Sequence, residues 1–206
     1  MEERLTQWMA ALERPRWDDS EGRERVAEEM RRVGGDVLFV LLAAKLTDAD
    51  PEVRCQAVTT LLRVDASRTL ALVLPMLSDP DWIVRWHTSG CLHNFGDERA
   101  IEPLIDLLGD DPEPSVRVNA AYALGGIASP AAIPALLAAL DSDHEENPLG
   151  HTPSSCAATA LDEILGTNET RVRVTDSLRC MATWPPDLDR LRRLATEMYE
   201  EWSAVN

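Results

Sequence analysis

The sequence predicts an all-α fold: a right-handed α-solenoid of stacked antiparallel helix pairs, with a helical cap at each end. Three observations support this fold class. An acidic turn followed by a Val-Arg pair recurs after 31 and then 32 residues. Apolar residues within each unit recur at helical spacing, and an acidic residue or a proline stands where each helix begins. A fixed period of this length is typical of helical repeats, whose units pack against their neighbours.

The three clearest units begin near residues 50, 81 and 113, and each contains two apolar segments separated by a turn. The second segments, 70–77, 101–108 and 133–140, are predicted to form the second helix of each pair. The inward positions of the first helices are Val53, Ala57, Leu61 and Val64, then Val84, Thr88, Leu92 and Phe95, then Val116, Ala120, Leu124 and Ile127.

The predicted helix starts have a physical basis, because a carboxylate at the cap accepts hydrogen bonds from free backbone N–H groups. Proline at the first helical position gives up no bond. Asp50-Pro51 and Glu113-Pro114 fit this pattern, and Asp81-Trp82 fits it without the proline.

Fainter units flank the clear ones. Ser20 is predicted to begin a helix that Gly34-Gly35 breaks, and a further helix is predicted from residue 152 to Leu165, after an inserted acidic loop at 143–150. The prediction is a single repeat domain, 1–206. It has a cap at 1–14, repeats at about 20–46, 50–77, 81–108, 113–140 and 152–183, and a cap helix at 187–203.

Within these units, an Asp-Pro pair followed by Val-Arg, and the segment VRVNAAYALG at 116–125, resemble the motifs of HEAT repeats over residues 20–166. The variety they resemble most is the HEAT-like repeat of phycobilin lyases. The resemblance implies that the arginine of each Val-Arg pair binds the turn aspartate of its own or a neighbouring unit. A ladder of Arg54, Arg85 and Arg117 with Asp48, Asp79 and Asp111 is therefore expected. Ser154 replaces the arginine in the next helix, where we expect the ladder to end.

The charge balance limits the classes of partner. The chain carries 36 acidic and 20 basic residues, for a net charge of −16, which disfavours a broad nucleic-acid-binding surface. The longest apolar run, 37–44, is far shorter than the ~20 residues that cross a bilayer. The start of the chain lacks the features of a secretory signal. We therefore expect a cytoplasmic protein with no nucleic-acid or membrane partner, and with its four cysteines reduced.

No motif for catalysis or for a cofactor is recognisable in the sequence. His87, Cys91 and His93 resemble a metal cluster, but on a helix His93 points about 120° away from His87. Cys91 matches an inward position, so a core thiol is the simpler interpretation. His144 and His151 flank the acidic loop, and solvated loops of this kind usually bind nothing. No catalytic residue, metal site or cofactor is predicted.

Two surface features remain. The turns between units should lie along one edge of a solenoid, where their carboxylates would form an acidic stripe; capping and the arginine ladder alone explain many of these residues. On the helix 81–95, Trp82 and Trp86 lie one turn apart, opposite the core positions, with His93 close to the same line. A neighbouring unit or a cap could instead cover both indoles. The partner-binding residues predicted here are Trp82, Trp86, His93, Asp79, Asp81, Asp110, Asp111 and Glu113.

The function favoured by these features is a non-catalytic scaffold or adaptor that binds another protein, one with a basic surface. The repeat resemblance also implies an alternative, a chromophore-handling protein like the phycobilin lyases. A HEAT-like DNA glycosylase ranks last, because residues 101–150 contain nine acidic residues and one basic residue where a basic groove would be needed. The sequence alone does not specify the oligomeric state.

Overall fold

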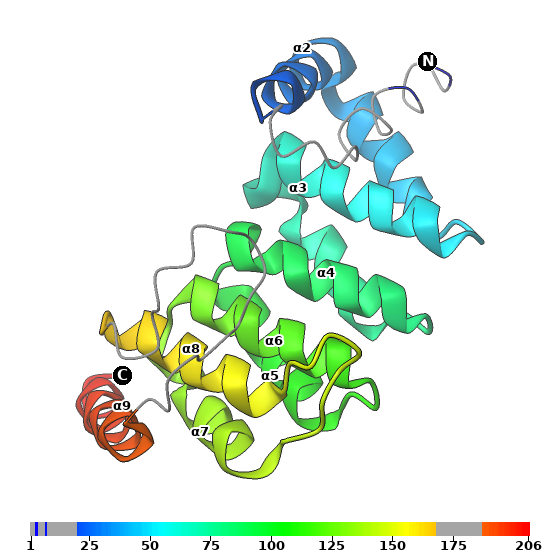
Figure 1. Ribbon diagram of the computed structural model, residues 1–206. Helices are drawn as coiled ribbons and strands as arrows, with labels where there is room; N and C mark the ends of the chain where they lie inside the picture. The colour runs from blue at the N-terminus through cyan, green and yellow to red at the C-terminus, as the bar shows by residue number, and fades with distance from the viewer. Residues whose placement is uncertain (1–2, 4–6, 8–19, 168–186) are drawn as a thin grey trace. The chain divides into compact units, whose positions relative to one another are not determined.

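The computed structural model describes residues 3, 7, 20–167 and 187–206 (Figure 1). Over these residues the chain is helical and contains no strand, which confirms the predicted all-α class. The remainder of the predicted cap at 1–14 and the end of the fifth predicted repeat lie outside the described residues. The chain groups into two compact units, Met1–Cys91 and Leu92–Asn206, and the division falls within one helix, α4 (Trp82–Phe95).

In the first unit, α2 (Ser20–Lys45) packs along α3 (Pro51–Val73), which is followed by a 3-10 turn, η1 (Leu74–Ser78). The helical assignment of α2 continues through Gly34-Gly35, where the sequence predicted a break, and the ribbon bends between its two halves (Figure 1). Glycine costs only about 1 kcal/mol relative to alanine inside a helix, and packing against a neighbouring helix can offset that cost. The largest fully buried side chains of this unit's core are those of Met30, Leu42, Leu61, Leu62 and Leu70.

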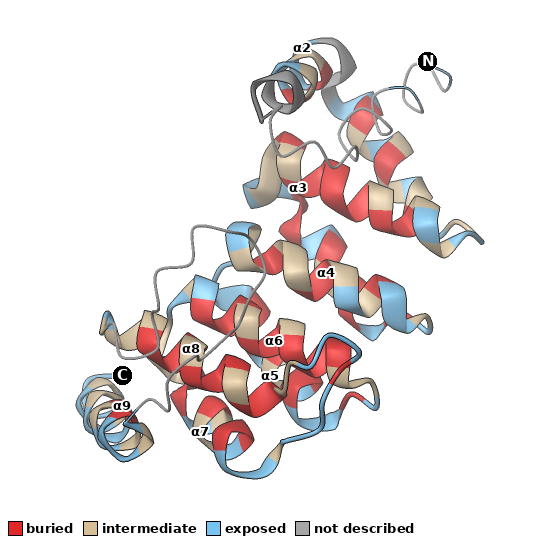
Figure 2. Cartoon of the chain, viewed as in Figure 1, coloured by how far each residue is buried: buried red, intermediate tan, exposed pale blue. Residues whose placement is uncertain are grey.

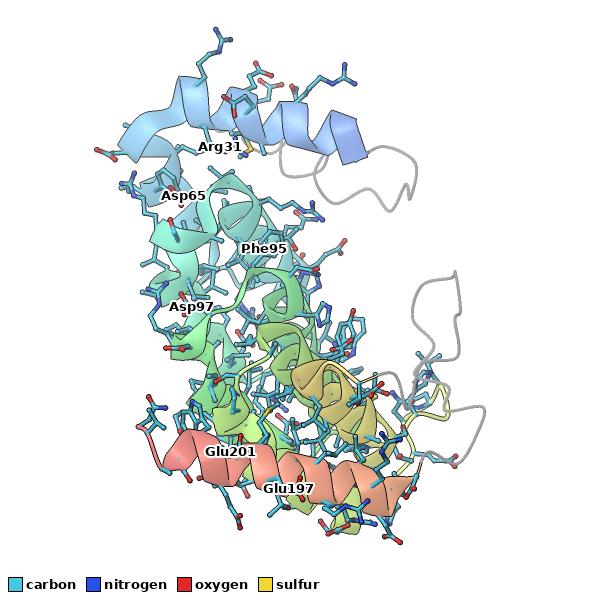
Figure 3. All side chains as sticks on the ribbon, turned by 90° about the vertical axis from the view of Figure 1, so that its left-hand side faces the viewer. Arg31, Asp65, Phe95, Asp97, Glu197 and Glu201 are labelled. Carbon is cyan, nitrogen blue, oxygen red and sulfur yellow. The ribbon has the colours of Figure 1, made fainter. Side chains whose placement is uncertain are left out.

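The long helix α3 contains the predicted turn between two helices. Asp65 leaves the helical conformation, with φ −162° and ψ 89°, and lies at the turn labelled in Figure 3. Its carboxylate accepts hydrogen bonds from the Ser67 hydroxyl at 2.8 Å and the Arg68 backbone N–H at 3.1 Å. Asp65 therefore ends one helix and caps the next, so that α3 and η1 together supply both helices of the repeat that begins at Pro51.

The second unit contains η2 (Glu98–Ala100), α5 (Ile101–Asp110), α6 (Pro114–Ile127), η3 (Pro130–Ala132), α7 (Ile133–Ser142), α8 (Pro153–Leu165) and α9 (Leu188–Ser203). Helix α6 packs against α5 and α8, and α7 packs against α8. Figure 2 shows that α6 and α8 are largely buried, whereas α9, which covers α7 and α8, exposes much of its surface. The core of the second unit includes the fully buried side chains of Leu92, Leu104, Leu124, Ile133 and Leu136.

The predicted caps differ in how they work. The side chains of Asp50 and Asp81 accept the N–H groups of Glu52 and Ile83, each at 2.9 Å. Glu113 occupies the cap position of α6, but its side chain makes no cap bond. Glutamate is one methylene longer than the preferred cap residues. The structure also shows caps that the sequence reasoning missed, Asp97 before η2 and Ser129 before η3.

Two adjacent glycines allow α6 to approach its neighbours closely. A Cβ atom on Gly126 would lie 2.4 Å from both the backbone oxygen and the Nδ1 atom of His93. A Cβ atom on Gly125 would lie 2.8 Å from the Cα atom of Ala160. Because the obstructing atoms include backbone, a larger residue at either position would force the helices apart.

We expect Gly126→Ala to lower the free energy of unfolding by about 1–3 kcal/mol, because the added methyl group overlaps the His93 backbone. The matched control is Gly109→Ala in α5, where an added Cβ meets no atom within 4 Å. That variant should gain about 0.5–1 kcal/mol from helix propensity. Urea denaturation measures both changes, and equal effects of the two substitutions would contradict the close-packing argument.

Candidate protein-binding face

A buried arginine joins two turns of the first unit. Arg54, on α3, donates from Nε and Nη2 to the Asp79 carboxylate at 2.8 and 2.7 Å. Its Nη1 atom donates to the backbone oxygen of Asp48 at 2.9 Å. Both side chains of the ion pair are buried, and the hydrogen bonds with Asp79 raise the pKa of Arg54. The two-point geometry of this pair fixes the position of one turn against the next.

Arg117 makes the corresponding contacts in the second unit. Its Nη1 atom donates to the backbone oxygen of Asp111 at 2.8 Å, and its Nε atom donates to the carboxylate of Asp143 at 2.6 Å. Its Nη2 atom also reaches Glu145 at 2.6 Å, within the inserted loop. These bonds raise the pKa of Arg117 and hold the start of the loop against α6.

Arg85 repeats the backbone contact that Arg54 and Arg117 make with their own turns, and only the next helix, α8, lacks the arginine. Arg85 donates from Nη1 to the backbone oxygens of Asp79 and Pro80, at 2.8 and 3.3 Å. At the position where the sequence has Ser154, the hydroxyl instead donates to the Leu140 backbone oxygen at 2.8 Å, and the side chain is buried. The short Ser154 hydroxyl thus reaches only a nearby backbone oxygen, whereas Arg54 and Arg117 are long enough to bind the carboxylate of the next turn.

An exposed apolar face lies at the start of α4. Trp82, Ile83 and Trp86 are 43%, 44% and 39% exposed, and together they form what we call the indole face. Residues three and four positions apart are neighbours on a helix surface, so Trp86 lies beside both Ile83 and Trp82. The sequence reasoning missed Ile83. Comparison of the repeats reveals this residue, because the equivalent positions hold the polar residues Glu52 and Ser115.

The indole face does not extend as an exposed band along the repeats. The sequence places Cys55 and Val118 at positions equivalent to Trp86, and both are buried. Small side chains at these positions do not reach past their neighbours, whereas an indole does. At the positions of Trp82 and Trp86, exposed aromatic side chains are therefore specific to the repeat that begins at Asp81.

The predicted acidic stripe contains carboxylates of two kinds. Asp79 and Asp111 are buried, and each accepts a backbone N–H of its own turn at 2.9 Å, from Asp81 and Glu113 respectively. They support the turns from inside. The exposed acidic residues of the stripe are Asp50, Glu52, Asp110, Asp141, Glu145 and Glu146, whereas Asp48, Asp81, Glu113 and Asp143 are half-buried.

Sequence comparison identifies the family. The family model for HEAT repeats matches residues 38–117, 73–152 and 102–198. The chain belongs to the HEAT-repeat family. The resemblance stated from the motifs is thereby confirmed. No protein of curated function matches the chain significantly.

Solved structures show the same HEAT-repeat fold. A chain of the complex of CpcE and CpcF of phycocyanin lyase from Nostoc sp. PCC7120 is similar with a TM-score of 0.52 and 23% identity. The match covers 78% of this chain and 64% of that chain, so this protein spans less than two thirds of that relative's length. A chain from the structure of Kap95p bound to RanGDP is similar with a TM-score of 0.53 and 15% identity, over 78% of this chain and 24% of that chain. These similarities, together with the helix pairs seen here, confirm the α-solenoid class of fold.

His93, which was predicted to bind a partner together with Trp82 and Trp86, instead contacts another helix of the protein. Its ring stacks on Tyr122 in the second unit, with centroids 3.8 Å apart and planes 8° from parallel. Its Nδ1 atom lies 3.0 Å from the Tyr122 backbone oxygen. The ring thus packs between two HEAT-repeat helices, beside Gly126.

A small polar cluster connects α3 and α4 in the first unit. His87 Nε2 lies 2.7 Å from the Thr59 hydroxyl and 3.7 Å from the Cys91 sulfur. Burial lowers the pKa of His87 and raises the pKa of the Cys91 thiol. The cluster therefore holds an uncharged imidazole and a protonated thiol at neutral pH. Among the described residues, no three His, Cys, Asp or Glu side chains are placed to bind a metal ion.

We expect Arg54→Met to lower the free energy of unfolding by about 3 kcal/mol, because it leaves the buried Asp79 carboxylate without its cation. The control is Arg99→Met, which removes an exposed ion pair with Asp97 and should leave the free energy of unfolding nearly unchanged. Chemical denaturation of both variants measures the difference. Similar small losses would show that the buried pair does not hold the turns together.

The stability of the first unit should depend on pH through His87. Because the pKa of His87 is lowered below its ordinary value of 6.5, the unfolded chain takes up a proton below pH 6.5 before the folded chain does. The free energy of unfolding should therefore decrease as pH falls below 6.5, by up to about 1.4 kcal/mol per pH unit. His87→Gln should remove this component from denaturation curves measured between neutral and mildly acidic pH. The exposed His144, changed to Gln, serves as the control and should leave it in place.

Proposed function

We propose that the chain is a non-catalytic adaptor that uses its HEAT-repeat scaffold to bind another protein through the indole face. The observation that carries this proposal is the joint exposure of Trp82, Ile83 and Trp86 on one side of α4. Tryptophan is enriched among the residues that dominate binding energy in protein interfaces. Two indoles one helical turn apart supply a large apolar area with few rotatable bonds.

The packing of α4 supports an external role for these side chains. The opposite side of the helix already fills the core with Val84, Thr88 and Leu92, all of which are fully buried. Folding of this repeat therefore does not require aromatic residues at its outward positions. Exposed apolar side chains that fall together on a surface mark interaction sites more often than scattered ones do.

The polar cluster of Thr59, His87 and Cys91 does not favour catalysis. The thiolate is the nucleophilic form of cysteine, and burial raises the pKa of the Cys91 thiol. The adjacent imidazole is held within a hydrogen-bonded seam between two helices. The arrangement is better suited to joining α3 and α4 than to attacking a substrate.

The solved relatives support use of this fold for protein assembly. CpcE is in a complex with CpcF in one structure, and Kap95p binds RanGDP in the other. Helical repeat arrays present extended surfaces on which a partner can lie. No helix among the described residues is long and apolar enough to cross a membrane.

The double variant Trp82→Ala/Trp86→Ala should lose its protein partner without losing its fold. Removing a tryptophan from the centre of an interface costs about 2 kcal/mol or more, so the affinity should fall at least about thirtyfold for one such residue. The measurement is affinity capture from cells, identification of the bound protein by mass spectrometry, and titration with that protein in purified form.

Val37→Ser/Val40→Ser is the matched control, because these two α2 residues are exposed apolar side chains outside the indole face. It should keep the affinity of the parent chain. Equal binding by the parent and the double tryptophan variant, with both folded by circular dichroism, would contradict the proposal.

The alternative from the sequence, a phycobilin lyase-like role, has a direct test. The absorbance spectrum of a bilin would shift on mixing with the purified chain if the chain holds the chromophore. A shift that is lost in Trp82→Ala/Trp86→Ala would replace the adaptor proposal with this one.

A further inference from the structure

We propose that the indole face binds a segment of a partner protein in which lysine or arginine lies next to an apolar side chain. This inference rests on the proposed adaptor function and names the class of partner. It depends on an acidic rim beside the indole face, made of Asp50, Glu52 and Asp81. These three residues and the indole face all belong to the first compact unit.

The position of the acidic rim follows from the buried arginine. Arg54, in the first turns of α3, binds the carboxylate of Asp79, three residues before α4 begins. The pKa of Arg54 is also raised by the charge of Asp81, which places that carboxylate within electrostatic range. The starts of α3 and α4 therefore lie side by side. Residues 50 and 52 stand at the repeat positions equivalent to residues 81 and 83.

The cations of this edge are already engaged within the protein. Arg54 binds Asp79, Lys45 lies 3.5 Å from Asp48, and Arg85 donates to backbone oxygens. Asp50 and Asp81 instead accept backbone N–H groups as helix caps, and Glu52 is exposed. Among the described residues, none of the three rim carboxylates forms an ion pair. The rim thus presents negative charge to solvent next to an apolar surface.

A basic and apolar segment satisfies both features of this surface. The face of an indole ring attracts lysine and arginine cations, and the attraction increases when a partner excludes water from the contact. Carboxylates at the rim attract the same cations and repel an acidic segment. Ile83, between the two indoles along the chain, offers a contact for an apolar anchor. An amphipathic helix with a basic side is one form such a segment takes.

Three fluorescein-labelled model peptides of about five helical turns provide the probe: one of lysine and leucine, one of glutamate and leucine, and one of lysine and serine. Fluorescence anisotropy with the full chain measures their binding at low and high salt. The lysine–leucine peptide should bind more tightly than the other two, and its affinity should decrease as salt increases.

Charge-neutralised variants distinguish attraction by the acidic rim from attraction by the net negative charge of the whole chain. Asp50→Asn/Glu52→Gln/Asp81→Asn removes the rim charges while asparagine preserves the helix caps. It should weaken binding of the lysine–leucine peptide about tenfold. Glu98→Gln/Glu102→Gln/Asp106→Asn removes the same charge from exposed residues of the second unit and should change the affinity less than about threefold. Trp82→Ala/Trp86→Ala should abolish the preference for leucine over serine.

Equal effects of the two charge-neutralised variants would overturn the inference, because the attraction would then come from the net charge of −16. Tighter binding of the glutamate–leucine peptide, or no binding of the lysine–leucine peptide, would overturn it as well. These outcomes leave the adaptor proposal intact, since that proposal fails only when the tryptophan variant retains its cellular partner.

Discussion

A buried arginine that bridges two successive turns is the contact on which the remaining structure depends. Arg54 binds a backbone oxygen of its own turn and both carboxylate oxygens of the next turn. An ion pair of this kind, removed from water, is costly to break because the remaining charge has no hydration. Its planar, two-point geometry also fixes distance and angle together. The register between neighbouring helices therefore follows from one side chain.

That fixed register explains why the repeat can vary elsewhere. In the second unit Arg117 uses the same contacts to hold Asp143, and it adds Glu145 from the inserted loop. Beyond this attachment, the buried Asn147 accepts the backbone N–H groups of Leu149 and His151 at 2.9 and 3.0 Å. Hydrogen bonds thus fix the inserted loop at its start and near its middle. Helices α6 and α8, which lie on either side of the loop in the sequence, still pack against each other.

The outward positions of the first helices carry the features that distinguish one repeat from another. Inward positions are constrained by close packing, as the buried Gly125 of α6 shows, since a methyl group there would meet the Cα atom of Ala160. Outward positions have no such limit. Tryptophan is therefore accommodated at positions 82 and 86 without disturbing the core of the repeat, and the carboxylate of Asp81 beside it also caps α4.

The sequence by itself determined the helix pairs, because the spacing of apolar residues and the acidic caps act within a few residues of each other. Ala57, Leu92 and Leu124 are buried as predicted, and Asp50 caps its helix. The exposure of Trp82 and Trp86 also followed from helical periodicity. Only the tertiary structure decided which carboxylates are available to a partner, since the burial of Asp79 results from a contact with an arginine 25 residues away. It likewise decided that His93 stacks on Tyr122, because the partner ring belongs to another repeat, and helical spacing within one segment contains no information about contacts between segments.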